Sequence, residues 1–381
     1  MISLKKYLNN NYLKLNDDQL KKLLDLDSRY NTLILERRKF NEKDILNLNE
    51  EMDKFFENYE KGIKYYPQLK LGECKYCDKL IKNLTHLLNE FKSFNECYLS
   101  KFYIESLERE ICWCKFYIDK KTNPKKTWNG KPLDKKILGR AINIVKTTKF
   151  ENTKQMKNIS AKEAQKLIQK ALDELGYDWE PKIYDNMVAR MNVLPDKIIR
   201  ISSSASFSDA DIEGLIEHEV KGHIGRRYNG MRTGLYLMVH GLKGRNVLDE
   251  GLAIYNSIHN VDTVKPNVMF NIALKYVISY YKTRYGFCEV FDIVKDIIKD
   301  SGMPDKTLFK SIARAKREIM DTSLPGGISD DADYFIGYNL IKNMSDSERD
   351  DVLKYNIGIQ HLKYLDDIKQ FFKINKFKPI N

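Results

Sequence analysis

A histidine, a glutamate and a second histidine stand close together in the segment His218-Glu219-Val-Lys-Gly-His223. Imidazole and carboxylate groups are common Zn²⁺ ligands, and zinc proteases usually carry two histidines four residues apart on one helix. Here the spacing is five residues, which places the two side chains roughly 140° apart on an ideal α-helix. Gly222 makes a π-type turn or a helix end between the histidines easy to form. The spacing therefore predicts a metal site on a distorted helix.

A zinc site needs a third protein ligand and leaves its fourth position to water. The downstream segment Asp249-Glu250-Gly-Leu-Ala253 offers a carboxylate at what looks like another helix start. We expect Glu250 to be this ligand, with Asp249 as the second choice and His240 as the third. A downstream carboxylate is weak evidence for a metal site, because acidic residues are common. Two histidines at this spacing are stronger evidence, because the chain has six histidines in all.

Two blocks of sequence resemble the microtubule-associated tyrosine carboxypeptidase family, whose bacterial relatives are known as QEGLA-motif proteins. The first block contains the histidine segment followed by Arg227, Asn229-Gly230 and Asp249-Glu-Gly-Leu-Ala253. The second contains Arg314-Ala-Lys-Arg317, Asp321-Thr-Ser323, Pro325-Gly-Gly327, Ser329, Asp331 and Tyr334. Weaker likeness appears in Thr127-Trp128-Asn-Gly130 and Arg190-Met-Asn-Val193. The resemblance covers roughly residues 100 to 381.

The resemblance implies a zinc-dependent metallopeptidase with a zincin-like core and an HExxxH active-site helix. It makes His218, His223 and Glu250 the ligands of one Zn²⁺ and Glu219 the general base. Animal members of the family remove the C-terminal tyrosine of α-tubulin. This chain has Asp249 where the family commonly shows Glu or Gln, and we expect it to lack the long N-terminal extension of the animal enzymes. The implied substrate is an acidic protein tail, such as that of tubulin or microtubules.

Further residues follow from the chemistry of such an enzyme. The oxyanion of the tetrahedral intermediate needs a donor besides the metal, and we assign this role to Tyr334. A carboxypeptidase also binds a terminal carboxylate, which the planar fork of arginine recognises best. The candidates for this contact are Arg314, Lys316, Arg317 and Arg227. A strand over residues 197–207 could pair with an extended peptide along its edge.

The remaining pattern predicts an α+β protein that is predominantly helical, with one small sheet. Residues 1–118 form a helical N-terminal region, residues 119–136 a basic loop or linker, and residues 137–381 the catalytic domain. Leucines and a phenylalanine at helical spacing form a stripe between Leu80 and Phe91. Ser160 and Glu163 stand at capping-box spacing and Gly176 ends the helix that they begin. Strands are expected over residues 182–207, and helices after that.

Composition limits the partners. The 381 residues carry a net charge of +12, which favours an acidic partner. No signal peptide and no apolar run of ~20 residues is readable, so we expect a cytoplasmic protein, possibly associated with the cytoskeleton, without a membrane span. The six cysteines are too sparse for a disulfide framework, so we expect reduced thiols. Cys74 and Cys77 have the spacing of half a zinc knuckle, but Cys112 and Cys114 do not have the spacing of the other half. No nucleic-acid-binding module is recognisable.

Three functions remain open at this level. The first is a zinc carboxypeptidase that removes tyrosine from an acidic tail. The second is a peptidase of the same family with a different protein substrate, since bacterial relatives live without tubulin. The third is a non-catalytic basic protein that binds microtubules. The intact set of His218, Glu219, His223 and Glu250 is the feature that speaks against the third.

Overall fold

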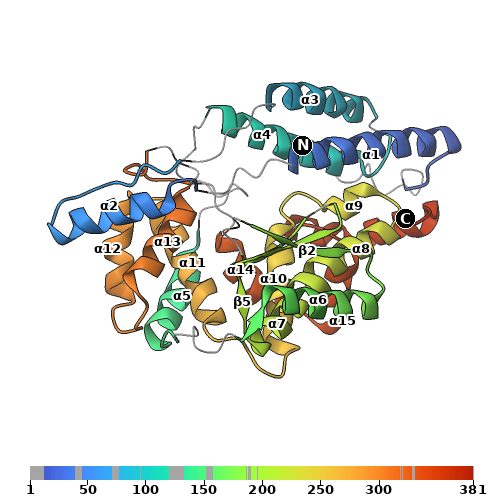
Figure 1. Cartoon of the computed structure of the whole chain (residues 1–381). Coiled ribbons are helices and arrows are strands. Elements are labelled where there is room, and N and C mark those ends of the chain that lie inside the picture. Colours follow the sequence, from blue (N-terminus) through green and yellow to red (C-terminus); the bar gives the residue numbers. More distant parts are fainter. Residues whose placement is uncertain are drawn as a thin grey trace.

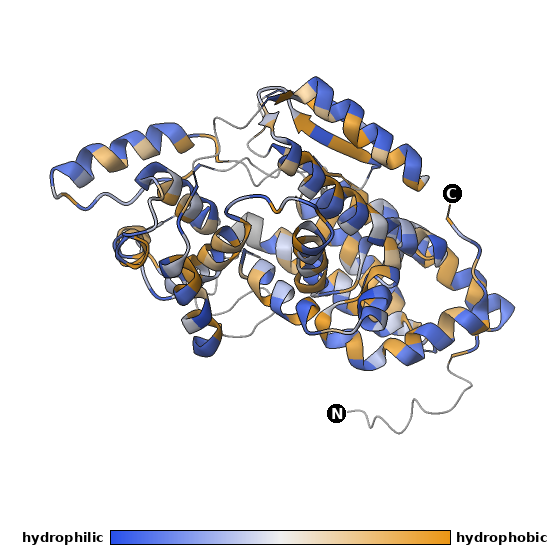
Figure 2. Cartoon of the chain, turned by 90° about the horizontal axis from the view of Figure 1, so that it is seen from below, coloured by the Kyte–Doolittle hydropathy of each residue, from blue (hydrophilic) through white to orange (hydrophobic). Residues whose placement is uncertain are grey.

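The computed structural model describes residues 13–38, 45–70, 77–94, 96–119, 133–151, 158–185, 187, 190–194, 196–317, 319, 321–327 and 331–380. Helices predominate in this part of the chain, and short strands form two small sheets. This confirms the α+β class with mostly helical content. The helices are amphipathic, with hydrophilic residues on their outer faces and hydrophobic residues turned towards the interior (Figure 2).

The N-terminal helices lie in two separate places (Figure 1). α1 (Asp17–Arg38), α3 (Cys77–Ser93) and α4 (Ser100–Asp119) form a layer next to α9 (Tyr236–His240). The predicted stripe on α3 is buried in a core that also contains residues of α9 and of α16 (Leu365–Asn375). By contrast, α2 (Leu48–Glu60) packs on α12 (Phe287–Ile297) and α13 (Asp305–Lys316), where Phe55 contacts Phe291. The N-terminal region is thus helical where described, and it shares both of its cores with the rest of the chain.

Local signals place the next two helices. Most of the predicted basic linker lies outside the described residues, and α5 (Lys135–Thr147) begins where the Asp134 side chain accepts a hydrogen bond from the Lys136 amide. α6 (Ala161–Leu175) begins with the predicted capping box between Ser160 and Glu163. It ends at Gly176, whose φ of 68° is the left-handed conformation that favours glycine.

The strands form more than the predicted single sheet. β2 (Glu180–Tyr184), β4 (Ile198–Ser202) and β3 (Met191–Val193) lie side by side in that order, with β2 parallel and β3 antiparallel to β4. β1 (Ile159–Ser160) and β5 (Ser206–Phe207) form a separate antiparallel pair. The prediction of a peptide-binding edge is wrong for β4, because β2 and β3 occupy both of its edges.

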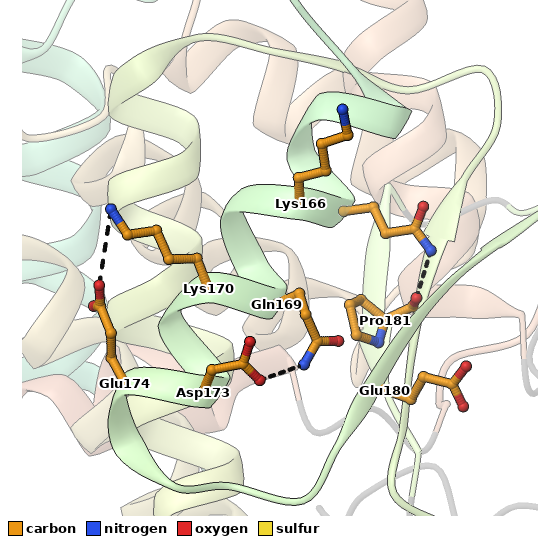
Figure 3. Close-up of a pocket in the computed structure, with 8 residues that line it drawn as sticks. Lys166, Gln169, Lys170, Asp173, Glu174, Glu180 and Pro181 are labelled. Carbon is orange, nitrogen blue, oxygen red and sulfur yellow. Dashed lines mark hydrogen bonds and ion pairs between the residues drawn. The ribbon is translucent and has the colours of Figure 1, made fainter.

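A groove between α6 and β2 is lined by polar side chains that pair with one another (Figure 3). The Gln165 amide donates to the Pro181 carbonyl oxygen at 2.7 Å, and the Gln169 amide donates to Asp173 at 2.8 Å. Since these groups are already paired along the groove, they do not converge on a ligand.

The remaining regular elements of the described chain are helices. They are α7 (Asp209–Leu215), η4 (Ile216–Ile224), α8 (Gly225–Arg232), α9, α10 (Asn246–His259), α11 (Val268–Lys282), α12, α13, α14 (Asp331–Lys342), α15 (Asp346–Lys354), η5 (Ile359–Tyr364) and α16. α10 and α14 pack together at the centre and contribute side chains to two hydrophobic cores. The predicted glycine interruption between α13 and α14 is present, with positive φ at Gly326 and Gly327.

Two further predictions meet the structure here. Among the described helices, none combines the length and the apolar character that a membrane span requires. Cys97, Cys112, Cys114 and Cys288 are thiols outside any disulfide, but Cys77 is disulfide-bonded, which corrects the prediction that all six cysteines are reduced. Cys74 lies outside the described residues.

Candidate metal centre

Both histidines lie on η4, which is a π-helix from Ile216 to Ile224. A π-helix closes its hydrogen bonds between residues five apart, so His218 and His223 are separated by one turn of it. Their rings lie 4.9 Å apart between centroids, with an interplanar angle of 86°. The helical distortion that the five-residue spacing requires is therefore present, and it brings the two imidazoles together.

Small residues let the neighbouring helix approach η4. A side chain added at Gly222 would place its Cβ 3.0 Å from the Ala253 Cβ on α10. On the other side of α10, a Cβ on Gly251 would lie 2.4 Å from the Gly337 backbone on α14. Because α10 touches η4 on one side and α14 on the other through such small residues, its position is fixed at close range. This packing places Glu250 next to the two histidines.

Glu250 completes a cluster of three possible metal ligands. Its Oε2 lies 3.7 Å from the Nε2 atoms of both His218 and His223. One ligand atom from each residue lies within 4.8 Å of the others, and this is the one cluster of its kind found in the described part of the chain. Glu250 Oε2 is buried without a hydrogen-bond partner. A buried carboxylate oxygen facing two imidazoles is a chemically suitable position for a Zn²⁺ ion, so the residues fit the metal.

Asp249 orients His223 through a contact with its Nδ1 atom. Its carboxylate accepts a contact from His223 Nδ1 at 3.2 Å and is also bound by Arg226 at 3.1 Å and Arg245 at 2.9 Å. A carboxylate on one imidazole nitrogen fixes the tautomer and leaves the other nitrogen available to a metal. Asp249 is thus outside the cluster rather than its third member. The remaining choice, His240, is buried elsewhere and bonds Asn31.

The charges around the cluster of His218, His223 and Glu250 favour a bound cation. Burial alone would lower the pKa of His223, but Asp249 and Glu250 outweigh it and raise this pKa to about 9. Burial and the neighbouring His223 hold the pKa of His218 well below its usual range. Burial raises the pKa of Glu219 to about 7, against the opposing effect of His223. The acids therefore attract positive charge, and a metal ion would compete with the proton on His223.

Basic residues from α11 and α13 form one wall near the cluster. Arg314 contacts Asp331 at 3.1 Å, and Lys275 Nζ lies 3.4 Å from the centre of the Tyr334 ring. Burial and the charge of Arg314 lower the pKa of Lys275 to about 8. Burial holds the pKa of Tyr334 well above its usual range, and the Glu250 charge adds to this effect. Arg314 and Tyr334 thus lie close enough to Glu250 for their charges to interact.

The other predicted substrate-binding residues are placed differently. Lys316 is fully buried, and its ammonium donates to the backbone carbonyl oxygens of Tyr285 and Leu324, each at 2.7 Å. These bonds hold the loop before α14, so a substrate carboxylate could reach Lys316 only by breaking them. Arg317 is partly buried, and its Nε has no hydrogen-bond partner. Arg227 lies on α8 beyond His223, with Nη1 buried and unpartnered.

Several contacts of the site were not predicted from the sequence. Arg226 and Arg245 form ion pairs with Asp249, and the Lys275 ammonium lies over the Tyr334 ring. One of these contacts had a readable signal, because Arg245 and Asp249 are four residues apart on a helix and such pairs meet. Lys275 had none, since it lies in a hydrophobic run on α11 that reads as an ordinary core helix.

Comparison with known proteins agrees with these blocks. A family model described as microtubule-associated tyrosine carboxypeptidase matches residues 123–375, which is more than half of the chain. The chain belongs to this family. Proteins named microtubule-associated tyrosine carboxypeptidase 1 are similar over 130 residues, at 31% identity in Homo sapiens and 30% in Rattus norvegicus. That similarity covers 33% of this chain and 26% of each relative, so the chain matches about a quarter of their length.

Proposed function

We propose that the chain is a zinc-dependent carboxypeptidase of the microtubule-associated tyrosine carboxypeptidase family, built on a zincin-like core. The observation that carries this proposal is the convergence of His218, His223 and Glu250, with an unpartnered Glu250 oxygen between two imidazoles. Family membership supports the reaction, because the relatives are named for removing tyrosine from a protein C-terminus.

The residues around the cluster would have separate roles in peptide hydrolysis. A bound Zn²⁺ would supply a Lewis acid that polarises the scissile carbonyl and lowers the pKa of water. Glu219 would take the proton of the attacking water and then give it to the leaving amine. Tyr334 would donate a hydrogen bond to the developing oxyanion, and Arg314 beside it would add positive charge. Arg314 is 47% exposed at its side chain, so it remains accessible to a substrate.

The substrate that fits best is an acidic protein tail with a C-terminal tyrosine, such as that of α-tubulin. The net charge of +12 would attract such a tail in a salt-dependent way. A microtubule-bound substrate would place the protein in the cytoplasm at the cytoskeleton. A different acidic protein tail remains the alternative substrate, for which the same site would serve.

Mass spectrometry of an incubated peptide tests the proposal. The zinc-loaded protein should release tyrosine from a peptide that ends in Glu-Glu-Tyr, and a chelator or Glu219→Gln should stop the release. The same peptide with an amidated C-terminus should remain intact. Equal cleavage of the amidated peptide would contradict the carboxypeptidase assignment and indicate an endopeptidase. Tubulin, assayed in parallel, tells whether its tail is a substrate.

A further inference from the structure

A cavity of about 260 Å³ lies beside Arg227, between α1, α8, α9 and the turn from β3 to β4. We call it the Arg227 cavity. Much of its wall is apolar, formed by Leu35, Met231, Val239 and Ile380. For comparison, an apolar cavity of about 150 Å³ is large enough to hold benzene. The Arg227 cavity can therefore take a large amino-acid side chain.

Two hydrogen-bond donors at this cavity have no partner. Nη1 of Arg227 and Nε1 of Trp179 are both buried, and neither makes a hydrogen bond. Burial and the charge of Arg245 lower the pKa of Arg227 to about 10, which reflects the poor solvation of its guanidinium. Neither side chain can accept a hydrogen bond, so only an acceptor would satisfy them. A carboxylate is the acceptor that matches a guanidinium best.

Arg227, which lines the cavity, connects it to the surroundings of Glu219. α8 begins at Gly225, directly after η4, so Arg227 follows His223 within about one helical turn. Glu219 and Arg227 are near enough for the charge of each to shift the pKa of the other. By contrast, the guanidinium of Arg314 already has the Asp331 carboxylate at 3.1 Å. The charges of Asp249, Glu219 and Asp196 also reach Arg227, and Asp196 lines the same cavity, but Nη1 of Arg227 has no hydrogen-bond partner.

We propose that the Arg227 cavity is the subsite for the C-terminal residue of the substrate, with Arg227 and Trp179 donating hydrogen bonds to its terminal carboxylate. This inference rests on the proposed carboxypeptidase function. It places the residue to be released next to Glu219, the group that must give a proton to the new amine. The apolar walls favour a large hydrophobic or aromatic side chain over a charged one.

Equilibrium binding tests the subsite without turnover. Zinc-loaded Glu219→Gln protein is titrated with a fluorescent peptide that ends in Glu-Glu-Tyr, as the free acid and as the amide, and anisotropy gives each Kd. The amide should bind at least about tenfold more weakly, because it lacks the charge that meets Arg227. Adding Arg227→Gln should bring the acid-to-amide ratio close to one, since the carboxylate and its partner are coupled.

Matched variants make the outcome decisive. Arg232→Gln removes an exposed arginine from the same helix and should keep the tenfold ratio. Trp179→Phe removes one donor without changing the charge, and it should reduce the ratio to an intermediate value. This variant decides the question if thermal melting shows that Arg227→Gln is unfolded. A ratio that persists in Arg227→Gln and Trp179→Phe, or that collapses in Arg314→Gln instead, would overturn the proposal.

The failure of the two proposals can be told apart. Wild-type protein that releases no residue, combined with an acid-to-amide ratio that depends on Arg227, would contradict the peptidase and support the subsite. Release of tyrosine with a ratio that is independent of Arg227 would support the peptidase and contradict the subsite.

Discussion

The metal-binding cluster and the basic end of α13 both belong to the sequence blocks that resemble the family, yet they differ in how their residues are used. His218, His223 and Glu250 come from two helices and meet at one point. Arg314, Lys316 and Arg317 are nearly adjacent in sequence, and their side chains serve different places. Closeness in sequence is therefore a weaker guide to a shared role than spacing that matches a helical turn.

Helical geometry explains this difference. Residues two apart on an α-helix point in directions roughly 200° from each other. Arg314 accordingly faces Asp331 near the cluster, while Lys316 is buried and bonds the carbonyl oxygens of Tyr285, between α11 and α12, and Leu324, in the loop before α14. On η4 the π-helical turn aligns residues five apart, which is the spacing of the two histidines. The following predictions test this contrast.

The largest effect should come from the cluster itself. Changing His218 or Glu250 to alanine removes one of three ligands, so we expect bound zinc to fall from near one equivalent to a small fraction. Peptidase activity should fall by about a thousandfold or more, which ΔΔG‡ of roughly 4 kcal/mol would represent. Metal analysis of the dialysed proteins measures the first effect. Glu174→Gln, at an exposed position on α6, is the control and should bind zinc as wild type does. Full zinc content in Glu250→Ala would contradict the ligand assignment.

The next largest effect should come from the close contact between α10 and α14. A methyl group at Gly337 would lie 1.9 Å from the Val247 carbonyl oxygen, so Gly337→Ala must push the two helices apart. We expect the free energy of unfolding to fall by about 3 kcal/mol and zinc affinity to fall with it. Urea denaturation and competition with a chelator measure the two quantities. Gly139→Ala on α5, where an added methyl meets nothing within 4 Å, should not destabilise the protein. Equal stability of Gly337→Ala and wild type would show that α10 and α14 accommodate the added methyl group without cost.

The basic end of α13 should separate into a structural and a functional residue. Lys316→Met leaves two loop carbonyl oxygens without a donor, and we expect about 2 kcal/mol less stability in urea denaturation. Arg314→Gln removes a half-exposed charge near the cluster, so it should change stability by less than about 1 kcal/mol and lower kcat/KM by about tenfold or more. The reverse pattern, with Lys316→Met stable and inactive, would restore the substrate-binding role predicted for Lys316.

An effect of similar size should come from the orientation of His223. Asp249→Asn keeps the shape of the side chain but weakens its contacts with His223, Arg226 and Arg245. Such indirect contacts typically change metal affinity by about 10- to 100-fold, and we expect a loss in this range. Chelator competition measures it. Asp173→Asn, on the exposed face of α6, serves as the control. A loss as large as that of Glu250→Ala would indicate that Asp249 binds the metal directly.

The sequence predicted the parts of the molecule that depend on local chemistry. The capping box of α6, the glycine that ends α6 and the distortion of η4 are all set by residues within a few positions of one another. Glu250 was preferred over Asp249 as the third ligand from the sequence, and the structure places its Oε2 3.7 Å from the Nε2 atoms of both histidines, whereas Asp249 contacts His223 at Nδ1. The geometry of the centre depends instead on Gly251 meeting Gly337, a contact between distant segments that no local pattern reveals.

Long-range packing also explains the predictions that were wrong. The strand predicted over residues 197–207 reads as an edge, but β4 within it has β2 on one side and β3 on the other. Likewise, Lys316 reads as a surface charge, and only the arrangement of the loop before α14 shows that its ammonium is enclosed by carbonyl oxygens. In each case the missing information was the position of a partner from elsewhere in the chain.

X-ray absorption spectroscopy at the zinc edge shows which atoms surround a bound zinc ion. The loaded protein should hold one zinc ion with nitrogen and oxygen neighbours at roughly 2.0–2.2 Å, including the scattering pattern of two imidazoles. That pattern should be lost in His218→Ala. A sulfur neighbour at about 2.3 Å would place the zinc at cysteines instead, and this result, like the absence of bound zinc, would contradict a metal centre formed by His218, His223 and Glu250.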